Sequence, residues 1–161
     1  MPIFATAGAK LHIGGAMSAD YTADLDAEDF NGESWVEIAP LESIGSVGDS
    51  AEQISFDAIG NARRHKLKGT RDAGTMEVVA AIYYSDAGQI ALLAAEKTAH
   101  SYAFRLVFND APPGGTPSER LFVAKVMSAS EALDTANNVM KLNATLAVDS
   151  NVVRVAAEEE L

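Results

Sequence analysis

The chain has no cysteine in its 161 residues, which excludes disulfide bonds and metal sites built from thiolates. It also lacks any apolar run near the ~20 residues that a helix needs to cross a bilayer. Its opening stretch, MPIFATAGAKLHIGG, has no basic flank ahead of a sustained apolar run and so is not typical of a signal peptide. We therefore expect a soluble protein that has no membrane contact and is made or assembled in the cytoplasm.

Basic residues are scarce and unevenly distributed. The chain holds 12 Lys and Arg against 23 Asp and Glu, for a net charge of −11. Because like charges repel, such a protein is not expected to wrap DNA by neutralising its phosphates. Residues 59–74, here called the basic segment, have few apolar side chains, so we predict a long exposed loop. They nonetheless hold a cluster of cations without an intervening acid: Arg63, Arg64, His65, Lys66, Lys68 and Arg71.

Alternation of apolar and polar residues predicts about eight strands, the clearest at residues 75–84, 102–108, 121–133 and 137–149. Pro40 interrupts a further candidate strand, which suits an edge position, a bend or a bulge because proline cannot donate to a ladder. These patterns contain no regular exchange of strands and helices, so they favour an antiparallel sheet protein.

A single helix is predicted at about residues 87–98. Asp86 and Gln89 have the spacing of a capping box, and apolar residues then recur at helical spacing. The resulting fold class is mainly β: an antiparallel β-sandwich or barrel-like fold with one flanking α-helix. Residues 1–161 are expected to form one domain, with an N-terminal arm at 1–10 and a frayed C-terminal tail at 156–161.

No pattern of catalytic or cofactor-binding residues stands out. His12, His65 and His100 lack a second ligand at metal-binding spacing. The acidic run at 24–29 lacks the glycine that an EF-hand loop needs at its sixth position. Phosphate-binding loops and nucleophile elbows are also missing. We therefore expect neither an enzyme nor a bound metal or cofactor.

The basic segment has three interpretations. It is a solvated loop, or a nucleic-acid contact that lacks aromatic stacking residues, or a surface that docks onto the acidic body of another copy. The third interpretation uses the charge asymmetry, because charge pairing sets the register and the association rate of such contacts.

The order of these features resembles the major tail tube proteins of long, non-contractile-tailed, siphovirus-like bacteriophages. The resemblance covers roughly residues 11–155. It is carried by GESWVEI at 32–38, LESIG at 41–45, ISFD at 54–57, DAGTME at 72–77, YYSD at 83–86, the helix at 89–96, YAFRL at 102–106 and the closing strand at 138–148. The acidic segment at 18–31 fits this pattern least well, and its role stays open.

The resemblance implies a structural virion protein of the tail, assembled in the host cytoplasm as hexameric rings that stack into a tube. Such a tube surrounds a tape-measure protein, meets tail terminator and tail-tip proteins, and later conducts DNA without binding it specifically. In that family the loop corresponding to the basic segment reaches the adjacent ring. An acidic bore fits the charge, because DNA must slide past it. Candidate lumen-facing acids are Glu37, Glu42, Glu77 and Glu119.

Two other classes stay open. One is a type VI-like secretion tube or another ring-forming assembly protein, which genomic neighbours would separate from a phage tube. The other is a small binding module whose basic loop grips an acidic ligand, which binding to an oligonucleotide at moderate salt would favour.

Overall fold

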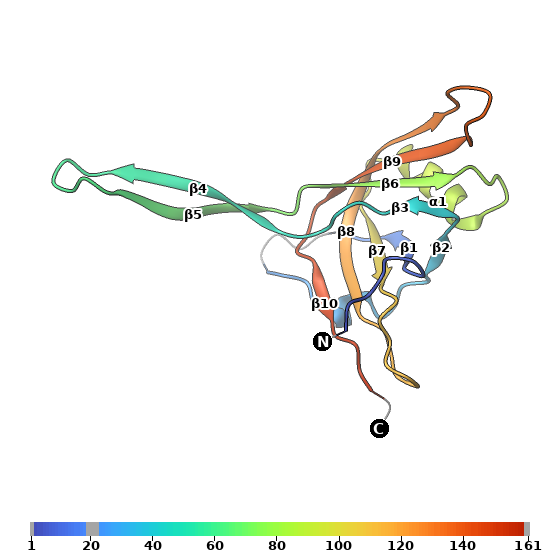
Figure 1. Cartoon of the computed structure of the whole chain (residues 1–161), viewed down its shortest axis with the longest axis horizontal. Coiled ribbons are helices and arrows are strands. Elements are labelled where there is room, and N and C mark those ends of the chain that lie inside the picture. Colours follow the sequence, from blue (N-terminus) through green and yellow to red (C-terminus); the bar gives the residue numbers. More distant parts are fainter. Residues whose placement is uncertain (1, 19–22, 160–161) are drawn as a thin grey trace.

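The computed structural model describes residues 2–18 and 23–159. These residues form ten strands, one α-helix and a short 3-10 helix: β1 (Lys10–Ala16), η1 (Ala27–Phe30), β2 (Val36–Ile38), β3 (Leu41–Ser43), β4 (Ser50–Asp57), β5 (Arg64–Asp72), β6 (Thr75–Ala81), α1 (Ala87–Glu96), β7 (Tyr102–Val107), β8 (Glu119–Ala132), β9 (Lys141–Val148) and β10 (Val153–Val155). In Figure 1 a body holds most of these elements, and β4 and β5 project from it as a long hairpin. None of the described helices is long and apolar enough to span a membrane.

Eight strands form one antiparallel sheet in the order β2-β1-β7-β8-β9-β6-β3, with β10 also paired to β8. The sheet folds over its own core, because inward side chains of β1, β2 and β7 belong to the same buried cluster as those of β6 and β9. Phe104, Phe122, Met76 and Leu146 are fully buried there. The predicted mainly β, sandwich-like fold with one helix is confirmed, although the sheet does not close into a barrel.

The 14-residue strand β8 joins the two layers. Its first half pairs with β7 and β10, and its second half pairs with β9. The register shifts between Val126 and Ser128, where a bulge bends the strand. Because one strand serves both layers, the layers are two parts of one sheet.

Helix α1 covers one side of this core, close to its predicted position. The Asp86 carboxylate accepts a hydrogen bond from the Gln89 backbone N–H at 3.0 Å, as the capping pattern predicts. The Gln89 side chain does not complete the capping box. Its Nε2 donates to the carbonyls of Ala39 and Ala81, both at 2.8 Å, and its Oε1 accepts from the Tyr83 N–H. Gln89 therefore ties the helix to the two strand ends beneath it.

The acidic segment at 18–31, whose role the sequence leaves open, covers a second apolar cluster. Its residues 19–22 lie outside the described ranges. Phe30, on η1, packs on Ala103, Leu121 and Val123, which point outward from β7 and β8. Leu25 is held from both sides, since its N–H donates to the Asn151 side chain at 2.8 Å and its carbonyl accepts from the same amide at 2.9 Å. The first half of β8 is consequently buried on both faces.

The structure corrects the prediction for the basic segment. Residues 64–72 are not a loop but strand β5, paired along its length with β4. Only residues 58–63 form the turn between them. The prediction was wrong because both faces of this strand are exposed, so neither burial nor a continuous apolar pattern marks it.

The two ends of the chain also differ from each other. Residues 2–9 of the predicted N-terminal arm form no strand or helix, and Ile3 and Phe4 are exposed. The tail predicted to be frayed is tied down at Glu158, which exchanges two backbone hydrogen bonds with Thr116. Residues 1, 160 and 161 lie outside the described ranges.

Candidate interaction surface

The hairpin formed by β4 and β5, here called the hairpin arm (residues 50–72), is exposed along its whole length. Every residue of β4 is exposed, and so is every residue of β5 except the half-buried Gly69. Among the described strands these two pair only with each other, and Figure 1 shows them extending away from the body. An isolated two-stranded hairpin has little stability of its own in water. The exposed faces of this hairpin are therefore a candidate surface for binding another protein.

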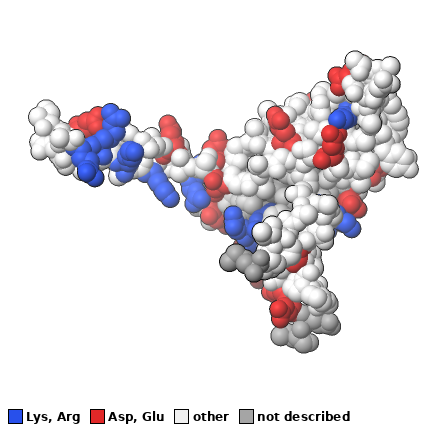
Figure 2. Space-filling model, in the orientation of Figure 1, with Lys and Arg blue, Asp and Glu red and all other residues white. Residues whose placement is uncertain are grey.

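The strand register gathers the basic side chains on one face of the hairpin arm. Arg64 lies opposite Asp57, Lys66 opposite Ser55, and Lys68 opposite Gln53. Directly opposed residues share a face of a sheet, so these three cations point the same way. Figure 2 shows the blue side chains following one another along the arm.

A bulge brings Arg71 onto the same face. Lys68 lies opposite Gln53 but Arg71 lies opposite Ala51, so β5 has one residue more than β4 in this interval. Without that extra residue, alternation would place Arg71 on the other face. The predicted cations Arg64, Lys66, Lys68 and Arg71 therefore form one row.

The other face of the hairpin arm carries its large apolar side chains, with Glu52 and Asp72 nearer the body. Ile54 lies opposite Leu67, and Phe56 lies opposite His65. Ile54 is 49% exposed, and Phe56 and Leu67 are each 61% exposed. Sequence reasoning missed this face, although its signal was present: Ile54 and Phe56 alternate with polar residues, and Leu67 stands between two lysines.

Some of the basic side chains are already paired. Arg64 Nε lies 2.9 Å from Asp57 Oδ1, and Arg71 Nη2 lies 3.1 Å from Asp49 Oδ2. Within the described residues, no carboxylate lies at ion-pair distance from Arg63, Lys66 or Lys68. These three remain available to an acidic partner.

The last two predicted cations, Arg63 and His65, contact Asn61 in the turn. The Arg63 N–H donates to the Asn61 side-chain oxygen at 3.1 Å, and His65 Nε2 lies 3.3 Å from Asn61 Nδ2. His65 itself belongs to β5 and lies opposite Phe56, so it is on the apolar face rather than in the row of cations.

The four predicted lumen acids lie on opposite outer faces of the folded sheet. Glu77, on β6, is opposite Thr145 and points away from the core, since Val78 next to it is buried. Glu42, on β3, joins it on this face and pairs with Lys141 at 2.8 Å. The remaining side chains of this face are small or polar, among them Val79, Ala81, Asn143, Thr145 and Ala147.

Glu37 and Glu119 lie on the other layer. Glu37 is opposite His12, and His12 is opposite Arg105 on the next strand. Arg105 lies 3.9 Å from a Glu119 oxygen and stacks over the Trp35 ring. Burial and the nearby Arg105 lower the pKa of His12. A single surface can hold at most one of the two acid pairs.

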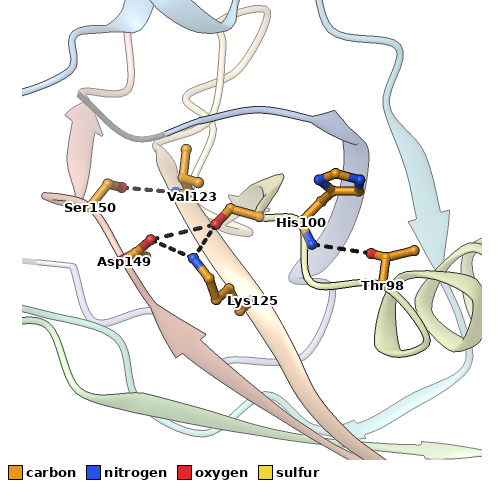
Figure 3. A network of polar contacts seen from close by, with 7 residues as sticks. Thr98, His100, Val123, Lys125, Asp149 and Ser150 are labelled. Atoms are coloured by element: carbon orange, nitrogen blue, oxygen red, sulfur yellow. Dashed lines mark hydrogen bonds and ion pairs between the residues drawn. The ribbon is translucent and has the colours of Figure 1, made fainter. Parts of the chain in front are cut away.

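A polar network links the two layers near their junction (Figure 3). Lys125 Nζ, on β8, lies 2.8 Å from Asp149 Oδ2 and 2.7 Å from Ser101 Oγ. The Ser150 hydroxyl accepts the Val123 N–H at 2.9 Å. In the described part of the chain, no three His, Asp or Glu side chains gather as a metal site.

No protein-family model matches the chain, and no curated protein matches it either. Solved structures do match in shape. A chain of the six-fold symmetrised anti-feeding prophage baseplate superposes with a TM-score of 0.70 at 11% identity, over 97% of this chain and 98% of that one. The SPP1 tail tube superposes with a TM-score of 0.63 at 16% identity, over 98% of this chain and 81% of that one.

A third match is the sheath/tube terminator structure of the extracellular contractile injection system PVC. It has a TM-score of 0.68 at 13% identity, over 97% of this chain and 98% of that one. The predicted resemblance to tail tube proteins is thus confirmed at the level of the fold: this chain has the fold that the SPP1 tail tube and components of contractile injection systems share.

Proposed function

We propose that this chain is a structural subunit of a bacteriophage tail tube, and not an enzyme. Its subunits form hexameric rings that stack in the virion tail, with a lumen that holds a tape-measure protein and conducts DNA at infection. Tail terminator and tail-tip proteins meet the two ends of the tube. One observation carries the proposal: a body with the tail-tube fold bears a long hairpin arm that projects away from it as a separate two-stranded sheet.

Charge supports docking of the hairpin arm onto another copy. Residues 50–72 carry five basic and three acidic side chains, so the remaining seven basic and 20 acidic side chains give the body a net charge of −13. Complementary charges speed encounter and fix the register of an interface. An arm at one place that binds a surface at another makes a heterologous contact, which generates rings or open filaments. Arg63, Lys66 and Lys68 are the cations free for this contact.

Of the two acid pairs, Glu42 and Glu77 are the better candidates for the lumen. The face that holds Glu37 and Glu119 carries the second apolar cluster and its cover, whereas the face of Glu77 presents small and polar side chains. Lys141 neutralises Glu42, which leaves Glu77 as the main negative charge of that pair. A weakly acidic, polar lining lets DNA slide without the phosphate contacts that a basic surface forms.

Negative-stain electron microscopy of the purified chain over a concentration series tests the proposal. Hollow tubes or rings of uniform width are expected, alone or after addition of preformed tail tips that initiate growth. A chain that stays monomeric under both conditions and binds a single-stranded oligonucleotide at moderate salt contradicts the proposal and favours a binding module.

A tube of the contractile or secretion type is the second candidate, favoured by the matches to contractile systems. Such a tube has to present an outer surface to a sheath. A sheath gene beside this one would favour that candidate, and a tape-measure gene without a sheath gene would favour the non-contractile tail.

A further inference from the structure

A groove lies on the body where residues 2–9 run beside the connection between β3 and β4. It has a volume of about 410 Å³, and its lining is mostly apolar: Phe4, Ile44, Val47, Leu106 and Phe108, with Asp110 at one side. Ser46 also lines it, and a second hollow beside Glu42 continues it. We call this surface the N-terminal groove.

The hairpin arm of the same chain cannot fill the N-terminal groove. Val47 lines the groove and β4 begins three residues later, at Ser50. From there β4 runs away from the body (Figure 1). Because a strand rises ~3.3 Å per residue, Phe56 lies roughly 20 Å beyond Ser50. Any copy of Phe56 that enters the groove therefore belongs to another molecule.

The hairpin arm carries exposed apolar side chains that match the apolar lining of the groove. Its apolar face offers Ile54, Phe56 and Leu67, all half-exposed or more. Exposed apolar side chains gathered on one projecting element mark an interaction site, because isolated soluble chains rarely leave them uncovered. Figure 2 shows a row of basic side chains along the arm and several acidic side chains on the body, so charge attraction brings the arm of one copy toward the body of another.

We propose that the apolar face of the hairpin arm of one copy occupies the N-terminal groove of a second copy. This inference rests on the proposed function and adds which face of the arm makes the contact and which surface receives it. Phe56 and Leu67 are buried against Phe4, Val47 and Phe108 of the neighbour. The row of cations then points away from the groove and remains open to a different acidic surface. One arm thus bridges two surfaces.

The absence of cysteine allows a sharp test by disulfide cross-linking. We would introduce the pair F56C and S46C, which places one thiol on the apolar face and one in the groove. The matched control is S55C with S46C, because Ser55 is the neighbouring residue on the opposite face. The Cα atoms of a disulfide lie within about 7 Å of each other, so neither pair can close inside one extended chain.

Assembled samples are oxidised and run on a non-reducing gel. F56C/S46C should give a ladder of covalent dimers, trimers and longer chains, and the ladder should be lost in S55C/S46C. Two results would overturn this inference and leave the proposed function intact. In the first, tubes form and S55C/S46C cross-links as well as F56C/S46C. In the second, tubes form and F56C/S46C gives no ladder. An unmodified chain that stays monomeric with and without preformed tail tips, and binds a single-stranded oligonucleotide at moderate salt, instead overturns the proposed function.

Hydrogen exchange on the unmodified chain keeps the test independent of the variants. Amides of residues 4–9 and 44–47 should exchange more slowly in tubes than in monomers. Equal exchange in both states would overturn the inference even if F56C/S46C failed to assemble.

Discussion

Gln89 Nε2 donates a hydrogen bond to the Ala39 carbonyl at 2.8 Å, across 50 positions of sequence. The same nitrogen reaches the Ala81 carbonyl, and Gln89 is 3% exposed. A residue expected to cap a helix is therefore the buried polar link between that helix and the ends of β2 and β6.

Replacing Gln89 tests that link. Gln89→Leu keeps the volume but leaves the Ala39 and Ala81 carbonyls and the Tyr83 N–H without their partner, and each buried unsatisfied group costs about 1–3 kcal/mol. Urea unfolding should therefore show a clear loss of stability. Ile90→Gln at the exposed next position is the control and should leave the midpoint nearly unchanged.

Gly88→Ala should destabilise the monomer even though alanine is the better helix former by about 1 kcal/mol. A Cβ at Gly88 would collide with the backbone carbonyl oxygen of Glu37, so α1 could not stay this close to β2. Thermal unfolding followed by circular dichroism measures the effect. At Gly48 an added Cβ meets nothing within 4 Å, so Gly48→Ala should change the melting temperature little. A melting temperature raised by Gly88→Ala would refute the close packing of α1 on β2.

Charge reversal on the hairpin arm should slow tube growth without unfolding the monomer. Lys66→Glu with Lys68→Glu removes two unpaired cations from an exposed hairpin, so the body keeps its packing. Light scattering measures growth, and circular dichroism checks the fold. The control, Lys97→Glu with Arg154→Glu, changes the net charge by the same amount at exposed sites outside the arm. Its tubes should grow faster than those of the arm variant. Equal growth of the two variants would show that the row of cations takes no part in docking.

Stability should fall on mild acidification because of His12. Burial, Arg105 and Lys10 lower its folded pKa below the ordinary value of 6.5, and Glu37 acts against them. The unfolded state then binds a proton first as the pH falls, so the His12 contribution is complete above pH 6.5 and is lost toward the lower folded pKa. Urea unfolding at several pH values should show this slope in the unmodified chain.

The slope should be smaller in His12→Gln, which cannot take up that proton. His100→Gln is the matched control, since His100 is exposed in the connection between α1 and β7. An unchanged slope in His12→Gln would contradict the assignment.

The buried elements could be predicted from the sequence because burial leaves a periodic pattern. Met76, Val78 and Ala80 alternate on β6, and helix α1 begins at its predicted cap. Strand β5 left no such mark, since neither of its faces is buried and it is held to β4 by backbone pairing and by exposed side-chain contacts such as the Arg64–Asp57 ion pair. Its two faces depend on register, and a one-residue bulge moves Arg71 from one face to the other.

The cover over the second apolar cluster was also hidden from sequence reasoning. Phe30 and Leu25 are single apolar residues within an acidic, turn-prone segment, so no periodicity identifies them. The long-range hydrogen bonds between Leu25 and Asn151 join residues 126 positions apart. Contacts of that separation depend on the complete topology, and the local pattern carries no information about them.

Strand β8 has a mechanical consequence for the subunit. Because its backbone runs unbroken from one layer into the other, sliding one layer over the other would require stretching a covalent chain rather than breaking weak side-chain contacts. A load applied to either layer is carried into the other along this strand. The two layers of the subunit are therefore expected to move together under shear.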